Sequence, residues 1–138
     1  MESLSSAGAG RATIKKETLM ANPFVHMELC TPDLAKAKEF YGKLFNWTFT
    51  DNDMGQGMVY STFKPDEGPG GGMYSMSDAP TAWLTYVGVD DINTATTKAT
   101  SLGATVIRGP LEVPGIGWMT IITDPTGAAI ALWQPKTA

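Results

Sequence analysis

The sequence carries an internal repeat, in which two segments share the same order of apolar and polar positions. Residues 31–49 align with residues 89–107, and Asp33 corresponds to Asp91, which gives an offset of 91 − 33 = 58 residues. A fixed offset of this kind is the signature of a duplicated structural unit. Because 138 residues fit a single domain, we expect two similar modules to share one core.

Each half of the repeat predicts one strand, one helix and three further strands. Alternating β-formers predict the strands, and apolar residues at helical spacing predict helices that begin after Thr31 and Asp90, the expected N-caps. In the first half the strands are expected at 24–30, 46–50, 58–64 and 72–76. In the second half they are expected at 82–89, 105–108, 117–123 and 128–134.

The order βαβββ–βαβββ predicts an α+β fold made of modules 23–76 and 82–135 within a domain spanning 23–138. One helix on three or four strands leaves a sheet face uncovered, so neither module is expected to be stable alone. Two modules side by side form a curved mixed sheet around a cleft, with the helices outside. Such a cleft is the natural place for a ligand.

Charge and cysteine content exclude several classes of protein. The net charge of −4, with ten basic residues scattered along the chain, argues against nucleic acid and against an anionic membrane surface as partners. Cys30 is the only cysteine, so no internal disulfide is possible and a reducing, cytoplasmic setting is expected. Residues 1–22 are rich in Ser, Gly and Ala and are expected to form a flexible arm.

Several segments then resemble the vicinal oxygen chelate superfamily, which includes glyoxalase I, bleomycin-resistance proteins and extradiol dioxygenases. The resemblance rests on the doubled βαβββ order and on the segments TPDLAKAKEFYGKLFNW, VDDI and DPTGAAIALWQ, which together span 24–134. It implies the glyoxalase/bleomycin-resistance fold. It does not imply one reaction, because the superfamily carries several chemistries on one scaffold.

The resemblance also implies where a metal ion would bind. Metal-dependent members hold a divalent ion with four side chains, usually two His and two Glu, from the first and last strands of each half. These positions fall on His26, Met73, Leu84 and Ala131. Leu and Ala have no lone pair to offer and a thioether prefers soft metals, so His26 is the only retained ligand position. We therefore expect no metal cofactor.

His26 and Glu28 are the candidate catalytic residues. They lie two residues apart on one expected strand, so they share a face and could act as an acid–base pair. His26 could equally be a hydrogen-bonded strand histidine, and Glu28 a partly hydrated residue at the mouth of the cleft or an anchor for a cationic ligand. Cys30 shares their face, and a buried inert thiol is the expected role.

The offset of 58 also predicts which side chains line the cleft. Tyr86 corresponds to Glu28, and Tyr60 corresponds to Trp118, so aromatic rings should face the cleft from both halves. Rings at these positions suit a planar or apolar ligand, although they could instead fill the cleft or a dimer contact. The expected cleft residues are Tyr60, Met73, Leu84, Tyr86, Trp118 and Ala131.

Three functions remain open. The first is a metal-independent protein of the resistance type that binds a small organic molecule, most simply as a homodimer. The second is a metal-dependent lyase, isomerase or dioxygenase in which a partner or the substrate completes the metal site around His26 and Glu28. The third is a subunit whose cleft is packed shut and whose role is association. Whether the modules pair within one chain or across a dimer is also open.

Overall fold

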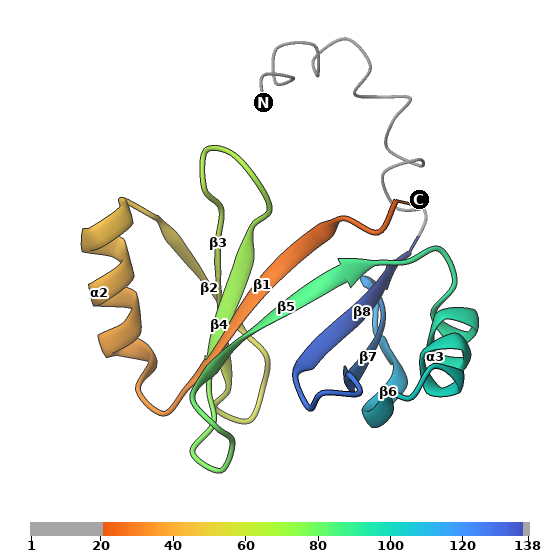
Figure 1. Cartoon of the computed structure of the whole chain (residues 1–138). Coiled ribbons are helices and arrows are strands. Elements are labelled where there is room, and N and C mark those ends of the chain that lie inside the picture. The colour runs from red at the N-terminus through yellow and green to blue at the C-terminus, as the bar shows by residue number, and fades with distance from the viewer. Residues whose placement is uncertain (1–20, 137–138) are drawn as a thin grey trace, which may run out of the picture.

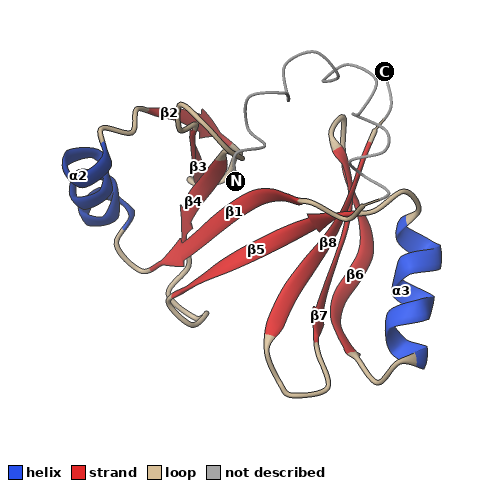
Figure 2. Ribbon diagram, turned by 45° about the horizontal axis from the view of Figure 1, so that its top comes forward, coloured by secondary structure: helices blue, strands red, loops and turns tan. Residues whose placement is uncertain are grey.

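The computed structural model describes residues 21–136, so most of the expected N-terminal arm lies outside the described residues. Within these residues, eight strands form one open mixed sheet in the order β2-β3-β4-β1-β5-β8-β7-β6, and two helices accompany it. The sheet curves, and the helices stand on its outer sides (Figures 1 and 2). This confirms the predicted α+β architecture. Among residues 21–136, no helix is long and apolar enough to cross a membrane.

The two halves of the chain contribute equivalent sets of elements. The first half contains β1 (Phe24–Thr31), α2 (Leu34–Phe45), β2 (Phe49–Asp53), β3 (Val59–Phe63) and β4 (Gly71–Ser75). The second half contains β5 (Ala82–Gly88), α3 (Ile92–Ser101), β6 (Thr105–Val113), β7 (Gly117–Thr123) and β8 (Ala129–Pro135). In each half the first strand pairs in parallel with the last, β1 with β4 and β5 with β8.

The halves meet through β1 and β5, which pair antiparallel at the centre of the sheet (Figure 1). His26 lies opposite Tyr86, and Glu28 lies opposite Leu84. Since 86 − 28 and 84 − 26 both equal 58, this pairing has the symmetry that the sequence offset predicts. The modules therefore pair within one chain.

Both helices begin one or two residues later than the sequence suggests. Asp33 caps α2, because its carboxylate accepts a hydrogen bond from the backbone N–H of Lys36. Asp91 caps α3 in the same way, through the N–H of Thr94. The expected caps, Thr31 and Asp90, are therefore wrong. In each helix the cap is the aspartate three residues before the backbone N–H that it binds, a spacing typical of N-caps.

The core lies between the sheet and the helices rather than in the concave face. In the first half, Leu29, Phe63 and Met73 form a buried cluster against side chains of α2 and of the segment that follows it. In the second half, Ile92 and Ile122 are buried, and the Thr96 hydroxyl on α3 is hydrogen bonded to that of Thr120 on β7 at 2.9 Å. These buried layers hold each helix to the back of the sheet and leave the front free.

Strand β6 is longer than the sequence indicates. Gly109 and Pro110 suggest a strand end, whereas the observed strand continues to Val113. The pairing of β6 with β7 shifts register on either side of Arg108. These irregularities accommodate Pro110, which has no backbone N–H to donate to a hydrogen bond between the strands. The continuation carries Val113 into the concave face.

Candidate functional site

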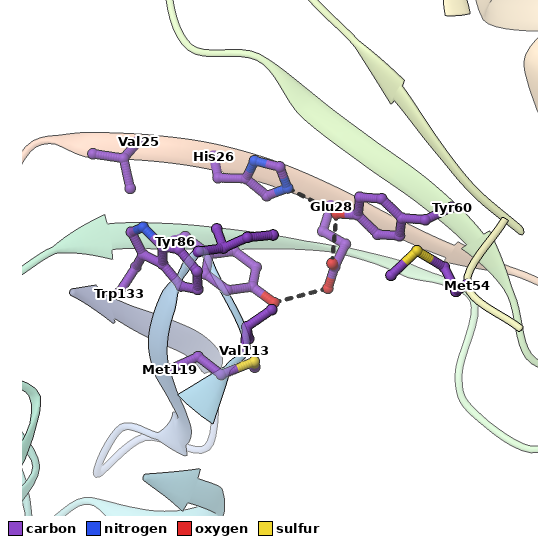
Figure 3. Close-up of a pocket in the computed structure, with 10 residues that line it drawn as sticks. Val25, His26, Glu28, Met54, Tyr60, Tyr86, Val113, Met119 and Trp133 are labelled. Atoms are coloured by element: carbon purple, nitrogen blue, oxygen red, sulfur yellow. Dashed lines mark hydrogen bonds between the residues drawn. The ribbon is translucent and has the colours of Figure 1, made fainter. Parts of the chain in front are cut away.

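A pocket of about 370 Å³ opens on the concave face of the sheet (Figure 3). Strands of both halves contribute side chains to it, so the pocket exists only because the modules share one sheet. Its volume lies within the range usual for small-molecule sites. A cleft that is packed shut, the third function considered above, does not fit this structure. The lining residues are Val25, His26, Glu28, Met54, Tyr60, Tyr86, Val113, Ile116, Met119 and Trp133.

Four polar side chains form a continuous hydrogen-bonded chain at one end of the pocket (Figure 3). The Tyr60 hydroxyl donates to Glu28 Oε2 at 2.7 Å, and the Tyr86 hydroxyl donates to Glu28 Oε1 at 2.9 Å. His26 Nε2 lies 2.8 Å from the Tyr60 oxygen. Because the single hydrogen of Tyr60 points to Glu28, His26 Nε2 serves as the donor to Tyr60. This arrangement leaves His26 Nδ1 as an acceptor when the ring is neutral.

Burial keeps three members of this chain uncharged. Desolvation lowers the pKa of His26, and the nearby negative charge of Glu28 only partly opposes that effect. Burial also raises the pKa of Tyr60 and of Tyr86 well above the ordinary tyrosine value, and the charge and hydrogen bonds of Glu28 add to the rise. The carboxyl group of Glu28 is therefore held by two neutral tyrosine donors.

The predicted site residues His26, Glu28, Tyr60 and Tyr86 all lie in this pocket. Leu84 and Ala131 lie on the same face of the sheet, since they are the strand partners of Glu28 and Tyr86, but they do not line the cavity. Their role as ligand contacts stays a prediction.

Met73 does not face the cleft, which corrects its expected position. Met73 is the strand partner of Leu29 and has no exposed surface, because it is packed in the core beneath α2. Its neighbour Gly72 is the partner of Glu28 and holds the cleft-side position. A Cβ at Gly72 would overlap the ring of Tyr60. The tyrosine therefore occupies the space that a side chain from this position would fill.

Trp118 also lies on the opposite face from the one expected. It shares a face of β7 with Thr120 and Ile122, which are buried on the side of α3, and the Lys136 ammonium stands 5.2 Å from the centre of its ring. Met119 takes the cleft position instead and is the strand partner of Trp133.

Both corrections have one cause, a slip in the repeat. On the first strands the offset is 58, but Tyr60 and Tyr74 correspond to Met119 and Trp133, which gives 119 − 60 = 59 and 133 − 74 = 59. The extra residue falls between the helix and the third strand of the second half, where the β6 ladder is irregular. A slip of one residue transfers a strand's side chains to the other face.

The residues present do not fit the divalent metal of the superfamily. With the corrected register, the four positions hold His26, Gly72, Leu84 and Ala131, and only the imidazole can donate to a metal. Among residues 21–136, no three His, Cys, Asp or Glu side chains gather as a metal site would require.

The cleft residues predicted from the sequence do not include the six apolar residues that line the pocket, namely Val25, Met54, Val113, Ile116, Met119 and Trp133. Met54 and Ile116 come from the loops between β2 and β3 and between β6 and β7, whose course the strand pattern does not define. Met119 and Trp133 could have been found by allowing a slip in the repeat, because both alternate with residues of strong core character.

Sequence and structure comparisons agree with this architecture. The model of the Glyoxalase/Bleomycin resistance protein/Dioxygenase superfamily matches residues 24–132, and the chain belongs to that superfamily. It is 36% identical over 114 residues to "Putative glyoxylase CFP32" of Mycobacterium bovis, covering 78% of this chain and 44% of that protein. It is 34% identical over 127 residues to the anthracycline biosynthesis protein DnrV of Streptomyces peucetius, covering 78% and 45%. The chain thus spans less than half the length of these relatives.

Solved structures share the fold at low sequence identity. A hypothetical protein, BH1468, from Bacillus halodurans C-125 superposes with a TM-score of 0.68 at 12% identity, over 86% of this chain and 97% of that one. Methylmalonyl-CoA epimerase from Mycobacterium tuberculosis superposes with a TM-score of 0.63 at 15% identity, over 87% and 91%. At this level of identity, the similarities show a shared fold only.

Proposed function

We propose that this chain binds a small organic molecule in the concave pocket and does so without a catalytic metal ion. The observation that carries the proposal is the composition of the pocket, where the polar groups of His26, Glu28, Tyr60 and Tyr86 gather at one end and the remaining walls are apolar. A few convergent polar groups in an apolar cavity are typical of sites that orient a ligand. Only His26 among the four superfamily positions could donate to a metal, which agrees with a binding role.

A planar ligand with an apolar body fits these walls best. Tyr86 stands nearly edge-on to His26, with ring centres 5.3 Å apart, and also to Trp133, with ring centres 6.4 Å apart. Rings set at such angles present both faces and edges to a bound molecule. The relative DnrV is named for anthracycline biosynthesis, and anthracyclines carry a planar aromatic ring system.

An enzyme that uses the same polar end is the second candidate. The linked groups of His26, Tyr60 and Glu28 could exchange a proton with a bound substrate, as general acid–base catalysis requires. A metal-dependent lyase, isomerase or dioxygenase would need further ligands from a partner or from the substrate. Loss of turnover in His26→Ala, at unchanged ligand affinity, would favour this candidate.

The direct test is ligand-induced stabilisation of the full chain. Planar aromatic compounds should raise its melting temperature, and metal analysis of the purified protein should show no stoichiometric divalent ion. Met119→Trp places a bulky ring in the pocket and should abolish the rise in melting temperature. Leu102→Trp, which adds the same ring at an exposed helix end, should leave it intact. Bound stoichiometric metal, or equal responses from both variants, would contradict the proposal.

A further inference from the structure

The pocket is electrically asymmetric. Its ten lining side chains include one carboxylate, Glu28, and neither lysine nor arginine. The other titratable lining groups, His26, Tyr60 and Tyr86, are held in their neutral forms by burial. A bound molecule therefore meets a single negative charge within otherwise apolar and aromatic walls.

Glu28 has capacity for a further partner. An ionised carboxylate can accept about four hydrogen bonds, and Glu28 accepts two, one on each oxygen, from Tyr60 and Tyr86. A charge in an apolar cavity is unfavourable unless an opposite charge accompanies it. The polar end is thus completed most favourably by a positively charged group.

Two tyrosines contact the same carboxylate through their hydroxyl groups, and a tryptophan ring lies next to one of them. Tyr60 and Tyr86 bind it directly, and Trp133 stands against Tyr86 on the far side (Figure 3). The faces of tyrosine and tryptophan rings attract cations, and rings of this kind are used to bind quaternary ammonium groups. The geometry and the charge therefore favour the same kind of ligand.

We propose that the pocket selects organic ammonium ions, with the ammonium group beside Glu28 and between the rings of Tyr60 and Tyr86. The apolar or aromatic body of the ligand lies against Met119, Val113 and Trp133. This inference rests on the proposed binding function and specifies its ligand class.

Arg108 is the charged group that opposes this preference. A row of strand partners runs from His26 through Tyr86, Ala131 and Ile121 to Arg108, so the Arg108 position belongs to the concave face. Arg108 is exposed and lies outside the pocket lining. Burial raises the pKa of Tyr86, and the charge of Arg108 opposes the rise, so its field extends to the polar end. Removing this charge should favour a bound cation.

Three probes that share a naphthylmethyl group and differ in charge test the proposal. The cation is (2-naphthylmethyl)trimethylammonium, the neutral isostere is 2-neopentylnaphthalene, and the anion is 2-naphthylacetate. Binding to the full chain is measured by tryptophan fluorescence and by protein-observed NMR at fixed ionic strength. We expect the cation to bind at least about tenfold more tightly than the isostere, and the anion to bind most weakly.

Two variants with opposite expected effects separate charge from shape. Glu28→Gln keeps the size of the side chain and should weaken the cation by about tenfold or more. Arg108→Gln should tighten the cation by about twofold. Arg108→Gln, which lies outside the pocket lining, should change the affinity of the neutral isostere by less than about twofold. For Glu28→Gln the quantity compared is the ratio of cation affinity to isostere affinity, which should fall by about tenfold.

The possible outcomes distinguish this inference from the function on which it rests. Equal or tighter binding of the neutral isostere, or unchanged cation affinity in Glu28→Gln, would overturn the ammonium preference and leave the binding function standing. Failure of all three probes to bind would overturn both.

Discussion

The two modules share a fold but contribute different chemistry to the pocket. The first module supplies His26, Glu28 and Tyr60, and thus most of the polar end. The second module supplies Tyr86 as its single polar contribution, and otherwise apolar side chains such as Met119 and Trp133. The comparison teaches that two copies of one fold can divide a pocket, with one copy holding the charged group and the other shaping the apolar walls.

The difference extends behind the sheet. The first half is stabilised by Met73, Leu29 and Phe63, a fully apolar cluster, whereas the second half includes a buried threonine pair, Thr96 and Thr120. The cleft-side counterparts differ too, since Gly72 in the first half matches Ala131 in the second. Substitutions at corresponding positions of the two halves can therefore test how differently the two modules depend on those residues.

The largest effect is expected from Met73→Ala. Met73 has no exposed surface, so its truncation should lower the free energy of unfolding by about 2–5 kcal/mol. Leu132, its counterpart at the offset of 59, is only half-buried, and Leu132→Ala should have a smaller effect. Urea unfolding followed by circular dichroism measures both. Ligand affinity altered by Met73→Ala at temperatures where it is folded would contradict the placement of Met73 behind the sheet.

Tyr86→Phe tests the polar contribution of the second module. It removes a hydrogen bond to a charged group and should lower the free energy of unfolding by about 1.5–3 kcal/mol. Tyr74→Phe is the matched control, since Tyr74 is hydrogen bonded with Cys30, and its pKa is raised to about 12 mainly by burial. The control should cost less than about 1 kcal/mol, because a thiol is a weak partner. Equal losses in the two variants would show that Glu28 gains nothing specific from Tyr86.

Gly72→Ala tests why the first half carries glycine where the second carries alanine. The added methyl group would overlap the Tyr60 ring, so the variant should lose about 1–3 kcal/mol and separate Tyr60 from Glu28. NMR of the tyrosine ring would detect the displacement. Ala131→Gly, the reciprocal change, should lose only about 0.5–1 kcal/mol. A Gly72→Ala protein with wild-type stability and an unmoved Tyr60 would refute this explanation.

The smallest effect concerns pH. Because burial lowers the pKa of His26 below its value in the unfolded chain, the unfolded state binds more protons as the pH falls below about 6.5. The folded state should therefore lose stability as pH falls through the folded-state pKa, and regain it above about 6.5. His26→Gln should flatten this dependence in urea titrations between about pH 5 and 8. A wild-type curve parallel to that of His26→Gln would contradict the lowered pKa.

The sequence was sufficient for the order of elements in the two modules, because apolar periodicity and a fixed offset are properties of the chain itself, but it left open whether the modules pair within one chain. The sequence was insufficient for the side-chain directions on the later strands, where one inserted residue changes the offset between the halves from 58 to 59. The side that Met73 and Trp118 face depends on a slip that leaves hydrophobicity almost unchanged. The caps Asp33 and Asp91 were missed because neighbouring residues have nearly equal capping propensity.

Four of the ten residues that line the pocket followed from the sequence in the same way. His26, Glu28 and Tyr86 could be placed together because strand alternation and the symmetry of the offset of 58 both apply to them. The bonding of Tyr60 to Glu28 could not be predicted, because it depends on the absent side chain of Gly72. Met54 and Ile116 could not be predicted to line the pocket, because they lie in loops where strand alternation does not apply.

The irregular second half of the sheet has an evolutionary consequence. Val113, Ile116 and Met119 lie on a bulged strand, its turn and the strand that follows, and none of them takes part in the hydrogen bonds around Glu28. Mutations there can reshape the cavity without disturbing its charged end. New ligand preferences can therefore arise by substitutions in β6 and β7 that leave the side chains of β1 and β3 around Glu28 in place.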